Sequence, residues 1–141
     1  FGEALKPAFK DYARQIVANS QALAATLTGR GFHLVSGGTD NHLMLVNVAL
    51  SGLTGKDAAA ALDAAGIICN KNTIPFDKNS PFVTSGIRIG TASVTTRGMK
   101  EPEMRKIGTW IADILGDLKN TDLQAKVRSE VARLTASFLV P

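Results

Sequence analysis

One arginine stands in a stretch that otherwise looks like a buried strand. Residues 82–91 read FVTSGIRIGT, with Arg88 between two isoleucines and Gly86 and Gly90 two residues away on either side. Because side chains alternate along a strand, the isoleucines should face the core while the arginine and the glycines face the other way. A guanidinium in such a clearing can hold a carboxylate or phosphate through two parallel hydrogen bonds. It can equally pair with a carboxylate of its own chain or point into water, so the pattern leaves three interpretations.

The segment just before this strand is long, irregular and polar. Residues 70–82 read NKNTIPFDKNSPF and show no periodicity. Loops of this length inside compact domains are usually functional or disordered, and the apolar residues and two prolines favour an ordered path. The side-chain amides of Asn70 and Asn72 could bind a heterocycle. Asparagine, aspartate and serine are also the ordinary turn formers, so both interpretations stay open.

Other patterns that could carry chemistry are weaker. GLTGK (52–56) lacks a glycine and a Ser or Thr that a phosphate-binding loop requires, so it predicts only a capped helix start. TTRG (95–98) places Arg97 beside a turn, where we expect the side chain in solvent. No nucleophile is paired with a base by any visible pattern, and one cysteine with two histidines gives no metal-site spacing. The sequence predicts binding groups, no metal and no reactive centre.

Composition sets broad limits on the class of protein. The 141 residues suit one compact domain, and 45% hydrophobic with 20% charged residues is typical of soluble globular chains. No apolar run approaches the roughly 20 residues of a membrane span, and no signal-peptide pattern occurs. The net charge of +4 is spread along the chain with only 6% aromatics, which gives nucleic-acid binding little support. Cys69 is the only cysteine, which excludes an internal disulfide and favours a reducing, cytoplasmic setting.

Apolar periodicity and turn residues predict the elements that position these groups. Thr54 begins a helix as its N-cap, with Asp57 three residues later as a variant of the capping box. The expected helices are 2–30, 54–65, about 102–118 and 123–138, and the expected strands are 32–35, 42–50, 67–69 and the one around Arg88. This order predicts an α+β fold, in which a small, mostly antiparallel sheet is covered on one face by helices.

Five strings, taken in order, resemble the C-terminal portion of serine hydroxymethyltransferases: FGEALKP, LVSGGTDNHL, NKNTIPFD, SPFVTSGIRIGT and TTRG. The resemblance runs from Phe1 to about Leu115, and the last 26 residues resemble only the family's variable tail. It implies a pyridoxal 5'-phosphate enzyme of fold type I, the aspartate-aminotransferase fold. Such enzymes interconvert serine and tetrahydrofolate with glycine and 5,10-methylenetetrahydrofolate. It also implies that residues 1–141 are the C-terminal small domain, with helix 2–30 leading in from a missing large domain.

The resemblance also assigns residues, one position at a time. It implies that Arg88 holds the carboxylate of the amino-acid substrate. Asn72 matches the asparagine that hydrogen-bonds the folate pterin, and Ser80, Pro81 and Phe82 match a segment that lines the folate site. The family's Schiff-base lysine belongs to the large domain, and its motif does not occur here. No catalytic residue is therefore expected in this chain, and the chain alone is expected to be inactive.

Two departures from the family and two alternatives complete the expectations. Asn47 stands where the family commonly has aspartate, and Ala92 with Ser93 stands where Pro-Ala is common. The family assembles as homodimers or homotetramers, and we expect no nucleic-acid or membrane partner. The alternatives are the small domain of another pyridoxal-phosphate enzyme of this fold and a non-enzymatic α+β binding module. The NKNT and SPF segments favour the hydroxymethyltransferase, and the lack of aromatics beside Arg88 disfavours an RNA-binding sheet.

Overall fold

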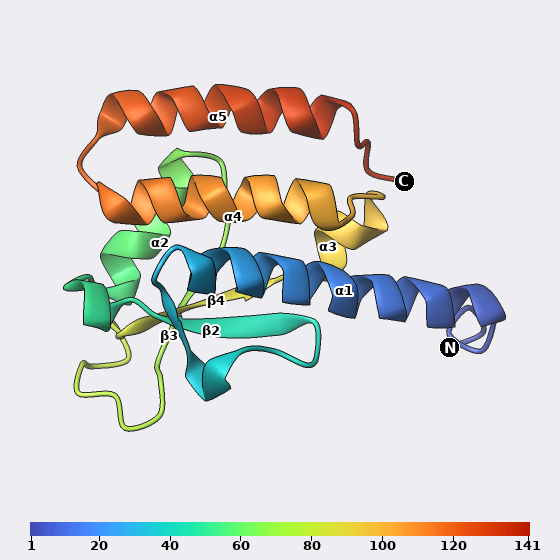
Figure 1. The fold of residues 1–141 in the computed structure, drawn as a ribbon, viewed down its shortest axis with the longest axis horizontal. Coiled ribbons are helices and arrows are strands. Elements are labelled where there is room, and N and C mark those ends of the chain that lie inside the picture. The colour runs from blue at the N-terminus through green and yellow to red at the C-terminus, as the bar shows by residue number, and fades with distance from the viewer.

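The chain folds into a small sheet with layered helices on one side (Figure 1). A computed structural model describes all 141 residues. The elements are, in chain order, helix α1 (Pro7–Gly29), strand β1 (His33–Leu34), the 3-10 helix η1 (Val35–Gly37), strand β2 (Leu43–Asn47), the 3-10 helix η2 (Ala49–Ser51), helix α2 (Gly55–Ala64), strand β3 (Asn70–Asn72), strand β4 (Gly86–Gly90), and helices α3 (Ala92–Thr96), α4 (Glu101–Gly116) and α5 (Thr121–Ala136).

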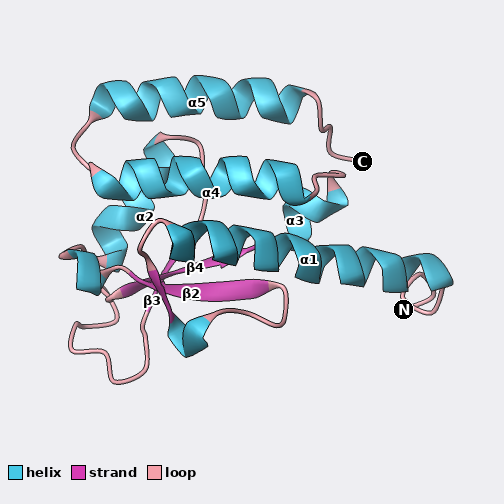
Figure 2. Ribbon diagram, in the orientation of Figure 1, coloured by secondary structure: helices cyan, strands magenta, loops and turns pink.

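The sheet has four strands in the order β1-β2-β4-β3, and every neighbouring pair is antiparallel. Its register places Leu45 of β2 and Asn70 of β3 directly opposite Arg88 of the central strand β4. The long helices α1, α2, α4 and α5 lie together on one side of this sheet (Figure 2). The predicted α+β class, with an antiparallel sheet covered on one face, is confirmed.

The core lies between the sheet and the helices. The strands contribute Met44, Val46, Ile87 and Ile89, all buried, so the isoleucines on either side of the arginine do face the core as predicted. Helices α1 and α2 contact the strands, α4 packs against α1 and α2, and α5 packs on α2 and α4 as the outermost layer. None of the helices combines the length and the apolar character that crossing a membrane requires.

Helix α1 is shorter than predicted and only its second half joins the core. It begins at Pro7, which suits the first turn because proline has no N–H to leave unpaired there. Its buried stripe begins at Ile16, and the first half projects beyond the body of the protein (Figure 1). Asn19 is fully buried in that stripe, and its Nδ2 donates to Thr95 Oγ1 at 2.8 Å and to the Met99 carbonyl at 2.9 Å. These bonds join α1 to α3 and to the segment between α3 and α4.

Helix α2 starts as predicted, but the strand after it does not. The Thr54 hydroxyl accepts a hydrogen bond from the Asp57 N–H at 3.1 Å, which is the expected N-cap. After Gly66, in the left-handed region at φ +81°, the prediction placed a buried strand at 67–69. The strand is instead Asn70–Asn72, and Ile68 is 86% exposed. Pairing with β4 starts only at Asn70. Backbone pairing with β4, and not the apolar character of residues 67–69, therefore decides where the strand lies.

Beyond β4 the structure differs from the prediction at Arg97. The two threonines of TTRG end a short helix, α3, that the sequence did not indicate, and Arg97 is its C-cap. The Arg97 side chain is half-buried and donates to the carbonyls of Phe138 and Thr135, at 2.7 and 3.0 Å. The expectation of a solvent-exposed side chain was therefore wrong. A cation at the end of α5 meets the carbonyls and the negative end of that helix, which favours this arrangement.

Candidate functional site

The candidate site is the outer face of the sheet, opposite the helices. By register and alternation its residues are His33, Leu43, Leu45, Asn47, Asn70, Asn72, Gly86, Arg88 and Gly90. Arg88 is the only Lys, Arg, Asp or Glu among them. The face is otherwise built of amides, leucines, glycines and one histidine, so its one fixed charge is positive and central.

Arg88 is exposed and has no partner within the chain. The ion pairs in the structure are Arg14–Asp11 and Arg30–Asp113, and no hydrogen bond involves the Arg88 side chain. Of the three sequence interpretations, pairing with a carboxylate of its own chain is therefore excluded. The five N–H groups of a guanidinium in a fixed planar fork remain free to receive an anion.

The two glycines that flank Arg88 have different surroundings. A Cβ built on Gly86 would lie 2.7 Å from Ile74 Cγ2 and 3.1 Å from the Val46 carbonyl oxygen. A Cβ built on Gly90 would be no closer than 3.4 Å to any atom beyond its chain neighbours, the nearest being the His42 carbonyl oxygen. The space at Gly86 is thus filled by the protein's own loop. Only the Gly90 side of Arg88 is clear.

Asn72 lies on the same face as Arg88, in the neighbouring strand. It ends β3 opposite Gly86, two residues along that strand from Asn70, the residue opposite Arg88. Its Nδ2 donates to the Thr73 carbonyl at 2.7 Å, whereas its Oδ1 accepts no hydrogen bond within the chain. The structure therefore places Arg88, predicted to bind the substrate carboxylate, and Asn72, predicted to bind folate, on adjacent strands of one face.

The remaining predicted residues, Ser80, Pro81 and Phe82, sit near the end of the loop that follows β3. All three are exposed, and the Phe82 side chain is 80% exposed. The Ser80 carbonyl accepts hydrogen bonds from the N–H groups of Val83 and Thr84, at 3.0 and 2.9 Å. The segment is thus a turn that precedes β4 in the sequence and exposes an aromatic ring to solvent.

Asp77 organises this loop, and the sequence interpretation missed it. Its carboxylate accepts four hydrogen bonds: Oδ2 from the N–H groups of Ile74 and Ser85 at 3.2 and 2.9 Å, and Oδ1 from the Asn79 N–H at 2.9 Å and the Ser85 hydroxyl at 2.6 Å. These bonds, that of the Ser85 hydroxyl foremost, lower the pKa of Asp77 from 3.8 to about 2. The signal in the sequence was an aspartate two residues before an asparagine, the pattern of a side chain that closes a turn onto the backbone.

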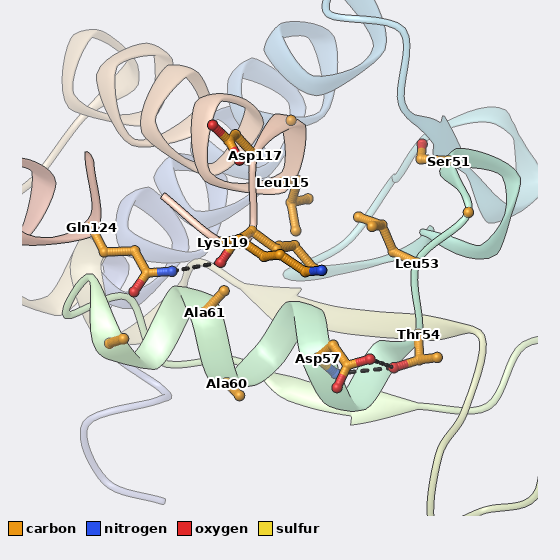
Figure 3. Close-up of a pocket in the computed structure, with 14 residues that line it drawn as sticks. Ser51, Leu53, Thr54, Asp57, Ala60, Ala61, Leu115, Asp117, Lys119 and Gln124 are labelled. Carbon is orange, nitrogen blue, oxygen red and sulfur yellow. Dashed lines mark hydrogen bonds between the residues drawn. The ribbon is translucent and has the colours of Figure 1, made fainter. Parts of the chain in front are cut away.

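A separate groove of about 770 Å³ lies between α2 and the α4–α5 turn (Figure 3). Ala60, Ala61 and Ala64 of α2 line one side, and Lys119 extends along it. Asp57 at its rim is already hydrogen-bonded to the Thr54 hydroxyl at 2.8 Å. None of the residues that the sequence predicted for a site lines this groove, so it is not the candidate site.

Comparisons with known proteins point to one family. The family model of serine hydroxymethyltransferase matches residues 1–111. The chain is 55% identical to serine hydroxymethyltransferase 1 of Pseudomonas aeruginosa over 140 residues, which is 99% of this chain and 34% of that protein. It is 52% identical to the serine hydroxymethyltransferase of Leptospira biflexa over 98% of this chain and 33% of that protein. The relative in Alkalilimnicola ehrlichii is 55% identical over 95% of this chain and 32% of that protein.

The similarity extends past the segment on which the sequence resemblance rested. The alignments with these relatives reach 95–99% of the chain, and so include much of the tail that the resemblance left aside. The chain spans about a third of the length of the curated relatives it matches. On the family model and these identities, the chain belongs to the serine hydroxymethyltransferase family.

Proposed function

We propose that this chain is the C-terminal small domain of a serine hydroxymethyltransferase and that Arg88 binds the carboxylate of the serine or glycine substrate. The observation that carries the proposal is an exposed guanidinium, without any partner in its own chain, at the centre of a sheet face that holds no other charge. A carboxylate accepts two parallel hydrogen bonds from such a group. The clear space at Gly90 gives it room to approach.

The folate part of the proposal rests on the arrangement around Asn72. The free Oδ1 of Asn72 is an acceptor for the N–H groups of a pterin ring. The exposed Phe82 ring, with Ser80 and Pro81 beside it, offers an apolar surface for the same ligand. We assign Asn72, Ser80, Pro81 and Phe82 to the tetrahydrofolate site because Asn72 lies on β3, beside the strand of Arg88, and residues 80–82 lie in the loop that joins the two strands.

The outer face does not fit the cofactor itself. Pyridoxal 5'-phosphate requires a lysine for its Schiff base and an acidic or basic partner for its ring nitrogen. The outer face holds no lysine and no acid, and Lys71 of β3 donates instead to the Phe82 carbonyl at 2.6 Å. We therefore assign the cofactor to parts of the protein outside this chain, together with the reactive groups.

The activity that we propose for the intact protein needs both parts: the binding groups of this chain, and the cofactor with the reactive groups outside it. The intact protein interconverts serine and tetrahydrofolate with glycine and 5,10-methylenetetrahydrofolate in the cytoplasm, as a homodimer or homotetramer. The 141-residue chain by itself should not convert serine to glycine above background, because it supplies binding groups only.

The test compares glycine binding by the intact protein and by its Arg88→Ala variant, with calorimetry at equal cofactor content. Loss of two charge-assisted hydrogen bonds should weaken glycine binding about a hundredfold. Arg105→Ala is the matched control, because Arg105 is an exposed arginine on α4 with no hydrogen bond from its side chain.

The outcomes separate the parts of the proposal. Glycine binding lost in Arg88→Ala and retained in Arg105→Ala supports the carboxylate role. Equal binding by Arg88→Ala and the unmodified protein rejects that role while leaving the enzyme assignment standing. An intact protein that binds neither pyridoxal 5'-phosphate nor glycine rejects the assignment as a whole.

A further inference from the structure

The loop between β3 and β4, residues 73–85, is held in one shape by hydrogen bonds within the loop and by bonds from neighbouring elements, among them that of the Gly55 N–H of α2 to the Thr84 carbonyl at 3.0 Å. Thr84 has φ +60° and Phe76 has φ +57°, both in the left-handed region that side chains other than those of glycine, asparagine and aspartate rarely adopt. Thr84 is buried, and its hydroxyl donates to the Gly86 carbonyl at 3.1 Å. Such strained residues persist only where surrounding contacts hold them, and they gather at functional sites.

The strongest of these contacts converge on the Asp77 carboxylate. It receives N–H groups from both arms of the loop, Ile74 on the outgoing arm and Ser85 on the returning arm. The Ser85 hydroxyl also donates to it, and that hydroxyl accepts from Asn79 Nδ2 at 2.9 Å. Hydrogen bonds to a carboxylate are about twice as strong as neutral ones. Asp77 therefore closes the loop at its base.

Residues 80–82 lie in the part of the loop that this closure controls. They are between Asn79 and Ser85, both of which are joined to Asp77. The Phe82 carbonyl also accepts a hydrogen bond from Lys71 Nζ at 2.6 Å, which further fixes the backbone of this residue. The side chains of residues 80–82 make no hydrogen bonds of their own, so their position depends on these neighbours.

We propose that Asp77 is a positioning residue for folate, fixing Ser80, Pro81 and Phe82 against the sheet without touching the ligand. The inference rests on the proposed folate site. Arg88 should be largely independent of Asp77, because β4 is hydrogen-bonded to β2 and β3 along both edges. Losing the Asp77 contacts should therefore weaken folate binding and spare amino-acid binding.

The test is equilibrium binding of tetrahydrofolate, under anaerobic conditions, and of glycine to the intact protein carrying Asp77→Asn. Asparagine keeps the shape and one acceptor oxygen but loses the charge and the second acceptor. The expected result is folate binding weakened about tenfold with glycine binding changed less than about twofold. Asp77→Ala should weaken folate further, so the asparagine variant should show partial rescue. Lys78→Ala is the control, because this neighbouring loop residue makes no side-chain hydrogen bond.

Each outcome decides the matter. Folate binding weakened selectively in Asp77→Asn, with Lys78→Ala unchanged, supports positioning by Asp77. Folate and glycine binding weakened equally, together with lower thermal stability, shows a merely structural residue and overturns the inference. Unchanged folate binding overturns it as well while leaving the proposed folate site intact. An unmodified protein that binds glycine but no tetrahydrofolate overturns both the folate site and this inference.

Discussion

Replacing Gly86 by alanine tests the packing beside Arg88, the arginine proposed to bind the substrate. An alanine Cβ at this position would lie 2.7 Å from Ile74 Cγ2, 3.0 Å from the Asn72 carbonyl oxygen and 3.1 Å from the Val46 carbonyl oxygen. The two carbonyls belong to β3 and β2, the strands on either side of β4. Because the methyl group would be crowded from both sides, neither strand can relieve it by moving alone.

The expected cost combines two opposing effects. Overpacking a filled site costs about 1–3 kcal/mol. Alanine recovers about 0.5–1 kcal/mol, since it loses less backbone entropy on folding than glycine does. The Gly86 backbone has no positive φ, so strain in the left-handed region adds nothing. We expect the free energy of unfolding to fall by about 1–2 kcal/mol, which moves a urea midpoint down by about 0.5–1 M.

The assay is urea unfolding of the 141-residue chain, followed by the fluorescence of Trp110. This is the only tryptophan, and it is 6% exposed in the core. Gly90→Ala is the matched control, because its Cβ would meet nothing closer than 3.4 Å, and it should change the midpoint little. Adding Ile74→Ala to Gly86→Ala should recover part of the loss. Equal midpoints for the two glycine variants would refute the close approach of Ile74 to β4.

Three further predictions concern other parts of the chain. Gly108→Ala should lower the free energy of unfolding by about 1–2 kcal/mol in the same assay, because its Cβ would lie 2.8 Å from Thr26 Cγ2 where α1 and α4 meet; unchanged stability would contradict that contact. The lowered pKa of Asp77, about 2 against an ordinary 3.8, means that its stabilising effect is complete above about pH 5 and is lost as the pH falls through 2. Acid titrations of the unmodified chain and Asp77→Asn should therefore differ most near neutral pH and converge below pH about 2. Burial raises the pKa of the Cys69 thiol to about 11, so a disulfide reagent at pH about 8 should modify it about a hundredfold more slowly in the folded chain than in urea.

The elements that the sequence predicted well are those with both a strong period and a chemical boundary. Thr54 ahead of Asp57 marked the start of α2. The break predicted between helices 102–118 and 123–138 is where the structure has it, and there the Asn120 side chain accepts the Leu123 N–H at 2.9 Å as the N-cap of α5. The alternation around Arg88 placed its neighbours correctly on the two faces of β4. In each case the decisive interaction is local, between residues a few positions apart.

The errors occurred where a distant partner decides the structure. The strand after α2 was misplaced because pairing with β4 selects Asn70–Asn72 over the more apolar residues before it. Arg97 was expected in solvent because its partners, the carbonyls of Thr135 and Phe138, lie some forty positions away in sequence. Asp77 was passed over because three of its four hydrogen bonds close the loop onto Ile74 and Ser85, and composition alone does not reveal which turn former does so.

The two glycines around Arg88 show how a symmetric pattern can have asymmetric causes. In sequence, Gly86 and Gly90 stand in equivalent places, and both suggested a cleared approach for a ligand. In the structure, Ile74 occupies the space beside Gly86, and only Gly90 leaves the outer face open. A carboxylate that approaches Arg88 therefore meets a filled wall on the side of the folate loop and open backbone on the side of Leu43 and His42.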